Sequence, residues 1–178
     1  MDFRNSKWAK ELLDKQRPDG SWGDFHSLSK PRGEIYTETA LRRLRILGFT
    51  IEDEPVRKAV DLMHRCLNGE AYKYGKPEKV THDFNMFNGL MYSAWIRLFT
   101  QDDELANGWA KKWADVITAA FSYGEYNDEA YRKSYTEIFG LKPHGGRLED
   151  FSCFYQVALL AGVLSGDTEV AFFKYIIN

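Results

Sequence analysis

The stretch Gln16-Arg17-Pro18-Asp19-Gly20-Ser21-Trp22 separates two runs of sequence with helical periodicity. It is the strongest indication of how the chain folds. A glutamine at the C-terminal end of a helix can hydrogen-bond backbone groups that would otherwise lack a partner. Glycine lets the chain reverse its direction, and tryptophan covers a turn with a large flat ring. We therefore predict that Gln16, Gly20 and Trp22 form a structural turn that fastens one helix to its neighbour.

Outward from this turn, apolar residues recur at helical spacing, and the alternation typical of strands is nearly absent. The expected helices span residues 6–16, 36–47, 53–67, 83–99, 103–120, 128–139, 150–164 and 168–177. No shift in charge or composition marks a domain boundary. The pattern predicts an all-α protein of about eight helices, packed as antiparallel helix hairpins in a single domain of residues 1–178.

Local signals add detail at both ends of the chain. Trp8 and Leu12 are expected to lie on the buried stripe of the first helix. Gly48 is expected to end the second helix at positive φ, and Asp167 to cap the last helix. The last helix is still apolar where the sequence stops. We expect that it docks as the final element, is covered by a second copy of the chain, or belongs to a longer protein.

Composition excludes several classes of partner. The chain has 12 Phe, 10 Tyr and 5 Trp, and so many rings must fill a core or line a cavity, with core packing as the default. The net charge of −2, with both signs interspersed, offers no footprint for nucleic acid and no basic membrane anchor. No apolar run is long enough to span a bilayer. Cys66 and Cys153 are far apart and fit free thiols in the cytoplasm.

Downstream of the turn, the pattern Thr37-x-x-Ala40-Leu41-x-x-Leu44-x-x-Leu47-Gly48 precedes another amphipathic helix that contains Pro55. Together with Gln16, Gly20 and Trp22, this order resembles the repeat of the terpenoid cyclase and protein prenyltransferase superfamily. The resemblance implies an α/α toroid, complete or partial, with 37–48 as an inner helix and 55–67 as the next outer helix. It covers residues 8–67 and rests on one copy of the turn motif.

The catalytic motifs of that superfamily are missing from the chain. No Asp-x-Asp-Asp occurs, and the sequence that begins Asp102-Asp103 has Ala106 where a magnesium-binding Asp-Asp-x-x-Asp motif needs its last carboxylate. His64 and Cys66 are two positions apart on one helix, so they face different directions and do not suit zinc. We expect no metal and no cofactor. Whether the protein is an enzyme stays open at this point.

The resemblance also implies where a ligand would bind, because the starts of the inner helices line the mouth of a toroid. Side chains there could supply a base, an acid and an anion clamp. The candidate catalytic residues at these positions are Tyr36, Glu38, His82, Asp83, Arg147 and Asp150. The alternative is that Asp83 and Asp150 only cap helices. The segment that starts at His144 could bind an anion through backbone N–H groups or be a plain glycine-rich loop.

Three functions remain open from the sequence. The first is a prenyltransferase-like or terpenoid-cyclase-like helical domain that lacks the catalytic motif and binds an apolar or carbohydrate small molecule, or no ligand. The second is an enzyme similar to the toroid-shaped polysaccharide lyases and glycosidases. The third is a non-catalytic module in which stacked helices present an edge to a partner or to another copy of the chain.

Overall fold

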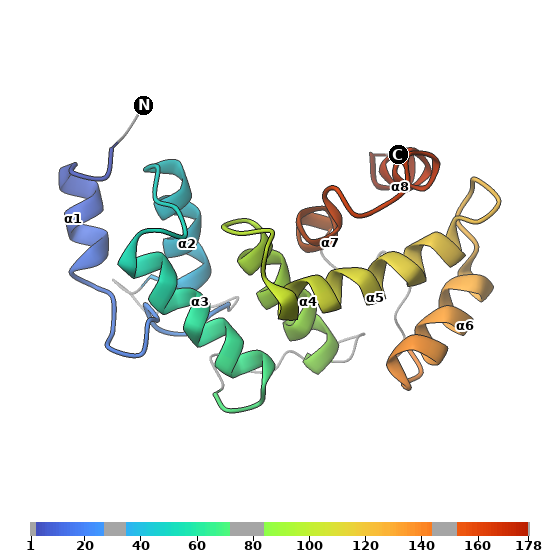
Figure 1. Cartoon of the computed structure of the whole chain (residues 1–178), viewed down its shortest axis with the longest axis horizontal. Helices are drawn as coiled ribbons and strands as arrows, with labels where there is room; N and C mark the ends of the chain where they lie inside the picture. The colour runs from blue at the N-terminus through green and yellow to red at the C-terminus, as the bar shows by residue number, and fades with distance from the viewer. Residues whose placement is uncertain (1–2, 27–34, 72–83, 144–152, 178) are drawn as a thin grey trace. The chain divides into compact units, whose positions relative to one another are not determined.

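A computed structural model describes residues 3–26, 35–71, 84–143 and 153–177 and divides the chain into two compact units, Met1–Glu78 and Lys79–Asn178. The described ranges contain eight α-helices and no strand (Figure 1). The prediction of an all-α protein is therefore confirmed. No described helix is both long enough and apolar enough to cross a membrane.

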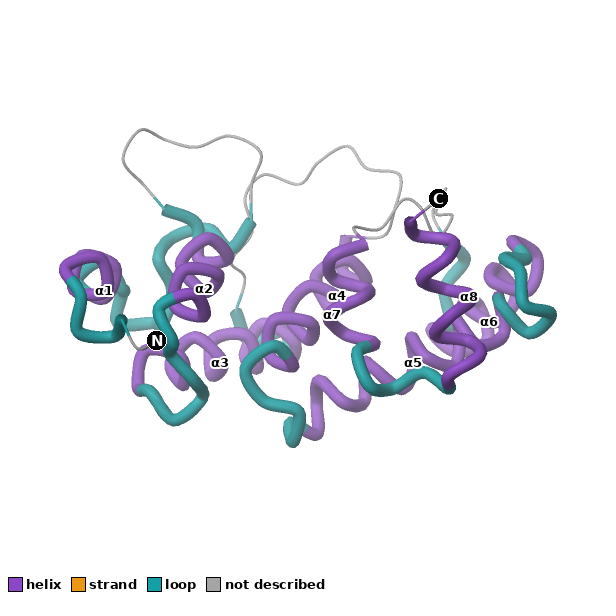
Figure 2. The backbone as a smooth tube through the Cα atoms, turned by 90° about the horizontal axis from the view of Figure 1, so that it is seen from above, coloured by secondary structure: helices purple, strands orange, loops and turns teal. Residues whose placement is uncertain are grey.

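The first unit contains helices α1 (Lys7–Leu13), α2 (Thr37–Ile46) and α3 (Glu54–Leu67). Helices α1 and α2 stand side by side in both views (Figures 1 and 2). Apolar side chains at helical spacing form the core of this unit, because each helix buries one apolar stripe of its surface. The fully buried members include Ala9, Leu41, Leu44, Val56, Ala59 and Met63.

Helix ends in the first unit follow their local sequence. The Ser6 Oγ accepts a hydrogen bond from the Ala9 backbone N–H at 3.2 Å, which satisfies one unpaired group at the start of α1. Pro55 lies in the first turn of α3, where its missing N–H does no harm. Gly48 follows α2 at φ +90°, as expected of the residue that ends a helix.

The second unit contains α4 (Phe84–Arg97), α5 (Glu104–Ala120), α6 (Asp128–Phe139), α7 (Cys153–Leu160) and α8 (Gly166–Ile177). Helix α5 is the centre of this unit and packs against each of the other four. The Asp103 and Asn127 side chains cap α5 and α6, each accepting a backbone N–H at 2.9 Å. Gly140 ends α6 in the left-handed conformation.

Aromatic side chains fill the core of the second unit. Trp113 is fully buried, and its ring lies 6.0 Å from that of Tyr135 and 5.3 Å from that of Phe139, measured between centroids. Tyr131 and Tyr135 are also buried, with centroids 5.9 Å apart. Edge-to-face and tilted pairs of this kind add to the stabilisation that burial provides. The aromatic residues of α5 and α6 therefore build a core.

A buried arginine ties three helical segments of the second unit together. Arg97 ends α4, and its Nη2 donates to the carbonyl oxygen of Ala161, just after α7, at 2.9 Å. Its Nη1 donates to the Asn107 side chain on α5. Burial lowers the pKa of this guanidinium, because a charged group loses hydration inside the protein. The partial negative charge at the C-terminal ends of α4 and α7 offsets part of that cost.

Two local expectations from the sequence are wrong. Trp8 is 72% exposed, because the buried stripe of α1 passes through Ala9 and Leu12 instead. Asp167 lies inside α8, which begins one residue earlier at Gly166. The N–H of Glu169 bonds to the carbonyl of Ser165, so Ser165 precedes the first turn. The Ser165 hydroxyl also bonds to that of Thr168 at 3.0 Å.

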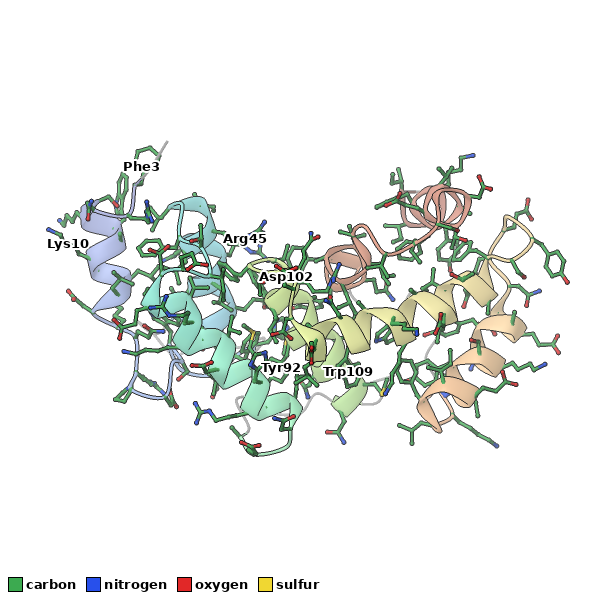
Figure 3. All side chains as sticks on the ribbon, viewed as in Figure 1. Phe3, Lys10, Arg45, Tyr92, Asp102 and Trp109 are labelled. Carbon is green, nitrogen blue, oxygen red and sulfur yellow. The ribbon has the colours of Figure 1, made fainter. Side chains whose placement is uncertain are left out.

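A close helix contact in the second unit yields a testable prediction. Gly89 on α4 lies against the Trp109 indole of α5, labelled in Figure 3, and an added Cβ would lie 2.2 Å from that ring. Gly89→Ala should therefore destabilise the protein by about 1–3 kcal/mol, despite the better helix propensity of alanine. Gly108→Ala on α5 should stabilise by about 0.5–1 kcal/mol, since a Cβ there meets nothing within 4 Å. Urea denaturation measures both, and the prediction fails if they shift the free energy of unfolding equally.

Candidate functional site

The turn from Gln16 to Trp22 lies where the three helices of the first unit meet. The Gln16 Nε2 donates to the carbonyl oxygen of Gly20 at 3.1 Å and to that of Pro55, on α3, at 2.9 Å. Gly20 has φ +92°, and a Cβ there would lie 2.2 Å from the carbonyl oxygen of Lys58. Glycine is therefore required at this point both by the backbone conformation and by the close approach of α3.

Trp22 connects the other two helices. Its indole Nε1 donates to the carbonyl oxygen of Leu12 on α1 at 2.7 Å, and its backbone N–H donates to the Thr37 Oγ1 at 3.0 Å. The Thr37 hydroxyl in turn donates to the carbonyl of Gly23 at 3.2 Å. Since Thr37 is the first residue of α2, Trp22 joins the end of α1 to the start of α2.

The start of α2 carries two of the predicted site residues, Tyr36 and Glu38, and both are buried. The first two N–H groups of this helix, on Thr37 and Glu38, donate to the carbonyls of Asp24 and Phe25 at 3.0 and 3.1 Å. These groups are therefore already satisfied by the chain, which leaves them no role in holding an anion.

A histidine that the sequence interpretation did not single out joins this group. The His26 Nδ1 lies 2.6 Å from the Glu38 Oε2, and the Arg42 Nη2 lies 3.9 Å from the Glu38 Oε1. A carboxylate in this position fixes the orientation of an imidazole ring. Because both oxygens of Glu38 face a partner, the arrangement holds the segment before residue 27 against α2.

The other predicted site residues cannot be placed with this group. His82, Asp83, Arg147 and Asp150 lie outside the described residues, as does the segment that starts at His144. Within the described residues no three His, Cys, Asp or Glu side chains gather as they would around a metal ion. The structure thus brings together Tyr36 and Glu38 from the predicted set, and adds His26 and Arg42 to them.

A groove of about 380 Å³ lies between α1 and α2 in the first unit. Its apolar lining comes from both helices and from residues just before and after α2, and the residues are Trp8, Leu12, Ile35, Ile46 and Leu47. Trp8 and Ile46 are 72% and 73% exposed, although both are large apolar side chains. Exposed apolar groups on both sides of a groove mark a surface suited to binding.

The charged side chains that line the same groove carry more positive than negative charge. Glu11, Lys15 and Arg43 complete its lining. The Glu11 carboxylate is 3.7 Å from the Lys7 ammonium in the next turn of α1, which offsets its charge. Lys15 and Arg43 form no ion pair with any part of the chain that the structure describes. The groove therefore combines an apolar lining with two positive charges that no described residue compensates.

Sequence reasoning missed this groove because it assigned Trp8 to the core. The signal on α1 itself was ambiguous, because Ala9 and Trp8 lie three and four residues before Leu12 and both spacings are helical. His26 had no such signal, because it lies 12 positions from Glu38 and only the folded chain brings the two together.

Comparison with known proteins adds no further assignment. No family model matches the chain, and no curated protein or solved structure matches it. The resemblance to the terpenoid cyclase and prenyltransferase superfamily therefore stays a prediction, which rests on the turn formed by Gln16, Gly20 and Trp22.

Proposed function

We propose that the protein binds a small apolar molecule with one anionic end in the groove between α1 and α2. The observation that carries this proposal is an apolar lining beside Lys15 and Arg43, two cations that form no ion pair with a described residue. The volume of about 380 Å³ falls within the range of small-molecule sites, about 300–1,000 Å³.

The lining favours a hydrocarbon over a carbohydrate. Leucine and isoleucine side chains make up most of its apolar part, and they offer no hydrogen bonds to sugar hydroxyls. Trp8 adds a flat apolar surface at the rim. A carboxylate or phosphate at one end of the ligand would lie near Lys15 or Arg43. Fatty acids and isoprenoid phosphates have this chemistry, and the latter agree with the predicted superfamily.

Binding can be tested with farnesyl diphosphate and dodecanoate as anionic probes and with farnesol as the neutral probe. We expect both anions to quench or shift tryptophan fluorescence, since Trp8 lines the groove, and to bind more tightly than farnesol. The double variant Lys15→Glu/Arg43→Glu should weaken anion binding roughly tenfold, because each reversal turns an attraction at a partly exposed site into a repulsion. Its affinity for farnesol should change little.

The matched control is Lys10→Glu/Arg45→Glu, which makes the same change in net charge, with one residue on α1 and one on α2. Neither residue lines the groove, and Figure 3 shows both side chains pointing away from the space between α1 and α2. This control should bind the anions as the parent protein does. Equal losses in the two double variants, or no binding of either anion by the parent, would contradict the proposal.

A further inference from the structure

Helix α8 presents an apolar stripe on the side that faces away from its own unit. Its inner face carries Thr168, Ala171 and Phe172, which are buried, and the Phe172 ring meets Phe121 edge to face at 6.0 Å. On the outer face, Val170 is 52% exposed and Ile177 is 80% exposed. Figure 1 shows α8 on the opposite side of α5 from α6, at the outside of the second unit.

The outer face of α8 has the spacing of a coiled-coil seam. Val170, Phe173 and Ile177 are separated by three and four residues, which are the intervals between the a, d and next a positions of a heptad. This assignment puts β-branched residues at both a positions, as two-stranded parallel pairs prefer. The same three residues, with Glu169 and Lys174, line a shallow hollow on the helix.

Two charged residues flank this seam at the positions that select a partner. With Val170 at an a position, Glu169 takes the g position of the preceding heptad and Lys174 the e position that follows Phe173. In a parallel two-stranded pair, a g residue lies next to the e residue five positions later on the other helix. Glu169 and Lys174 have the required separation of five and opposite charges, and neither forms an ion pair with the described residues.

We propose that α8 is a self-association surface that pairs in parallel with α8 of a second copy of this chain. The Val170, Phe173 and Ile177 side chains of the two copies would meet along the two-fold axis. Glu169 of each copy would then face Lys174 of the other. An antiparallel pair would instead bring Glu169 to the same side as its own equivalent, so the charges favour the parallel arrangement.

Charge reversal in the chain of 178 residues tests this proposal. Its mass is measured by sedimentation over roughly 10 to 1,000 µM, the range expected of a small interface. The parent chain should form a dimer. Glu169→Lys alone and Lys174→Glu alone should each weaken the dimer at least about tenfold, since each places like charges opposite one another. An equimolar mixture of these two variants should form a heterodimer, because every flanking contact is then again between opposite charges.

Two further variants test whether the effect belongs to α8 and whether the two helices run in parallel. Glu137→Lys makes the same charge change on α6, and should leave the dimer unchanged. Val170→Cys should give a covalent dimer on mild oxidation where the parent chain does not, because equivalent a positions are adjacent only in the parallel arrangement. A monomeric parent chain, single reversals that leave the dimer intact, or a mixture that fails to associate would each overturn the proposal.

Discussion

Gly20→Ala is expected to destabilise the unit built from α1, α2 and α3 by about 2–5 kcal/mol, from left-handed strain and overpacking together. Gly20 has φ +92°, and its Cα faces the backbone of α3 so closely that a Cβ would meet the Lys58 carbonyl oxygen at 2.2 Å. Backbone cannot swing aside as a side chain can. The variant must therefore either move α3 or lose the two hydrogen bonds that Gln16 makes across the turn.

The contribution of the contact can be separated from that of the backbone angle. Gly69 lies in the same unit at φ +75°, but a Cβ there would meet nothing within 4 Å. Gly69→Ala should therefore cost only the strain, about 1–2 kcal/mol. Hydrogen exchange of the α1–α3 amides in the full chain reports the loss for this unit alone. If the two variants lose the same protection, the close approach of α3 to Gly20 contributes nothing.

The helical architecture could be predicted because the local signals and the apolar spacing agree. The helix from Asp128 to Phe139 was predicted with its observed bounds, since Asn127 caps its start and Gly140 ends it. Where the signal for a helix end is ambiguous, the observed end differs from the predicted one. Helix α7 ends at Leu160 instead of residue 164, and Gly162 follows it at positive φ.

The candidate site was harder to predict, because its parts come together only in the folded chain. Tyr36 and Glu38 could be chosen from their place at the start of a helix. His26 could not, because nothing in the spacing of 12 residues links it to Glu38. The groove depends on which stripe of α1 is buried, and a short helix with apolar residues on two neighbouring stripes leaves that choice to tertiary packing.

Trp22→Ala should have an effect of similar size, about 3–5 kcal/mol, because it removes a large buried ring from the junction of α1 and α2. Only 2% of Trp22 is exposed, and its indole N–H donates to the carbonyl oxygen of Leu12 near the end of α1 at 2.7 Å. Without the indole, that carbonyl keeps the longer bond from the Lys15 N–H, at 3.2 Å, and loses its shorter one. Urea denaturation followed by circular dichroism measures the loss.

Trp22→Phe separates the contribution of the hydrogen bond to the free energy of unfolding from that of the ring. Phenylalanine retains most of the buried aromatic surface but removes the indole donor from the Leu12 carbonyl, which should cost about 0.5–1.5 kcal/mol. The backbone N–H of Trp22, which donates to the Thr37 Oγ1, is untouched by the change. If Trp22→Phe is as stable as the parent, the ring alone joins α1 to α2. If it loses as much as Trp22→Ala, the hydrogen bond to Leu12 sets how the two helices meet, and with it the width of the groove between them.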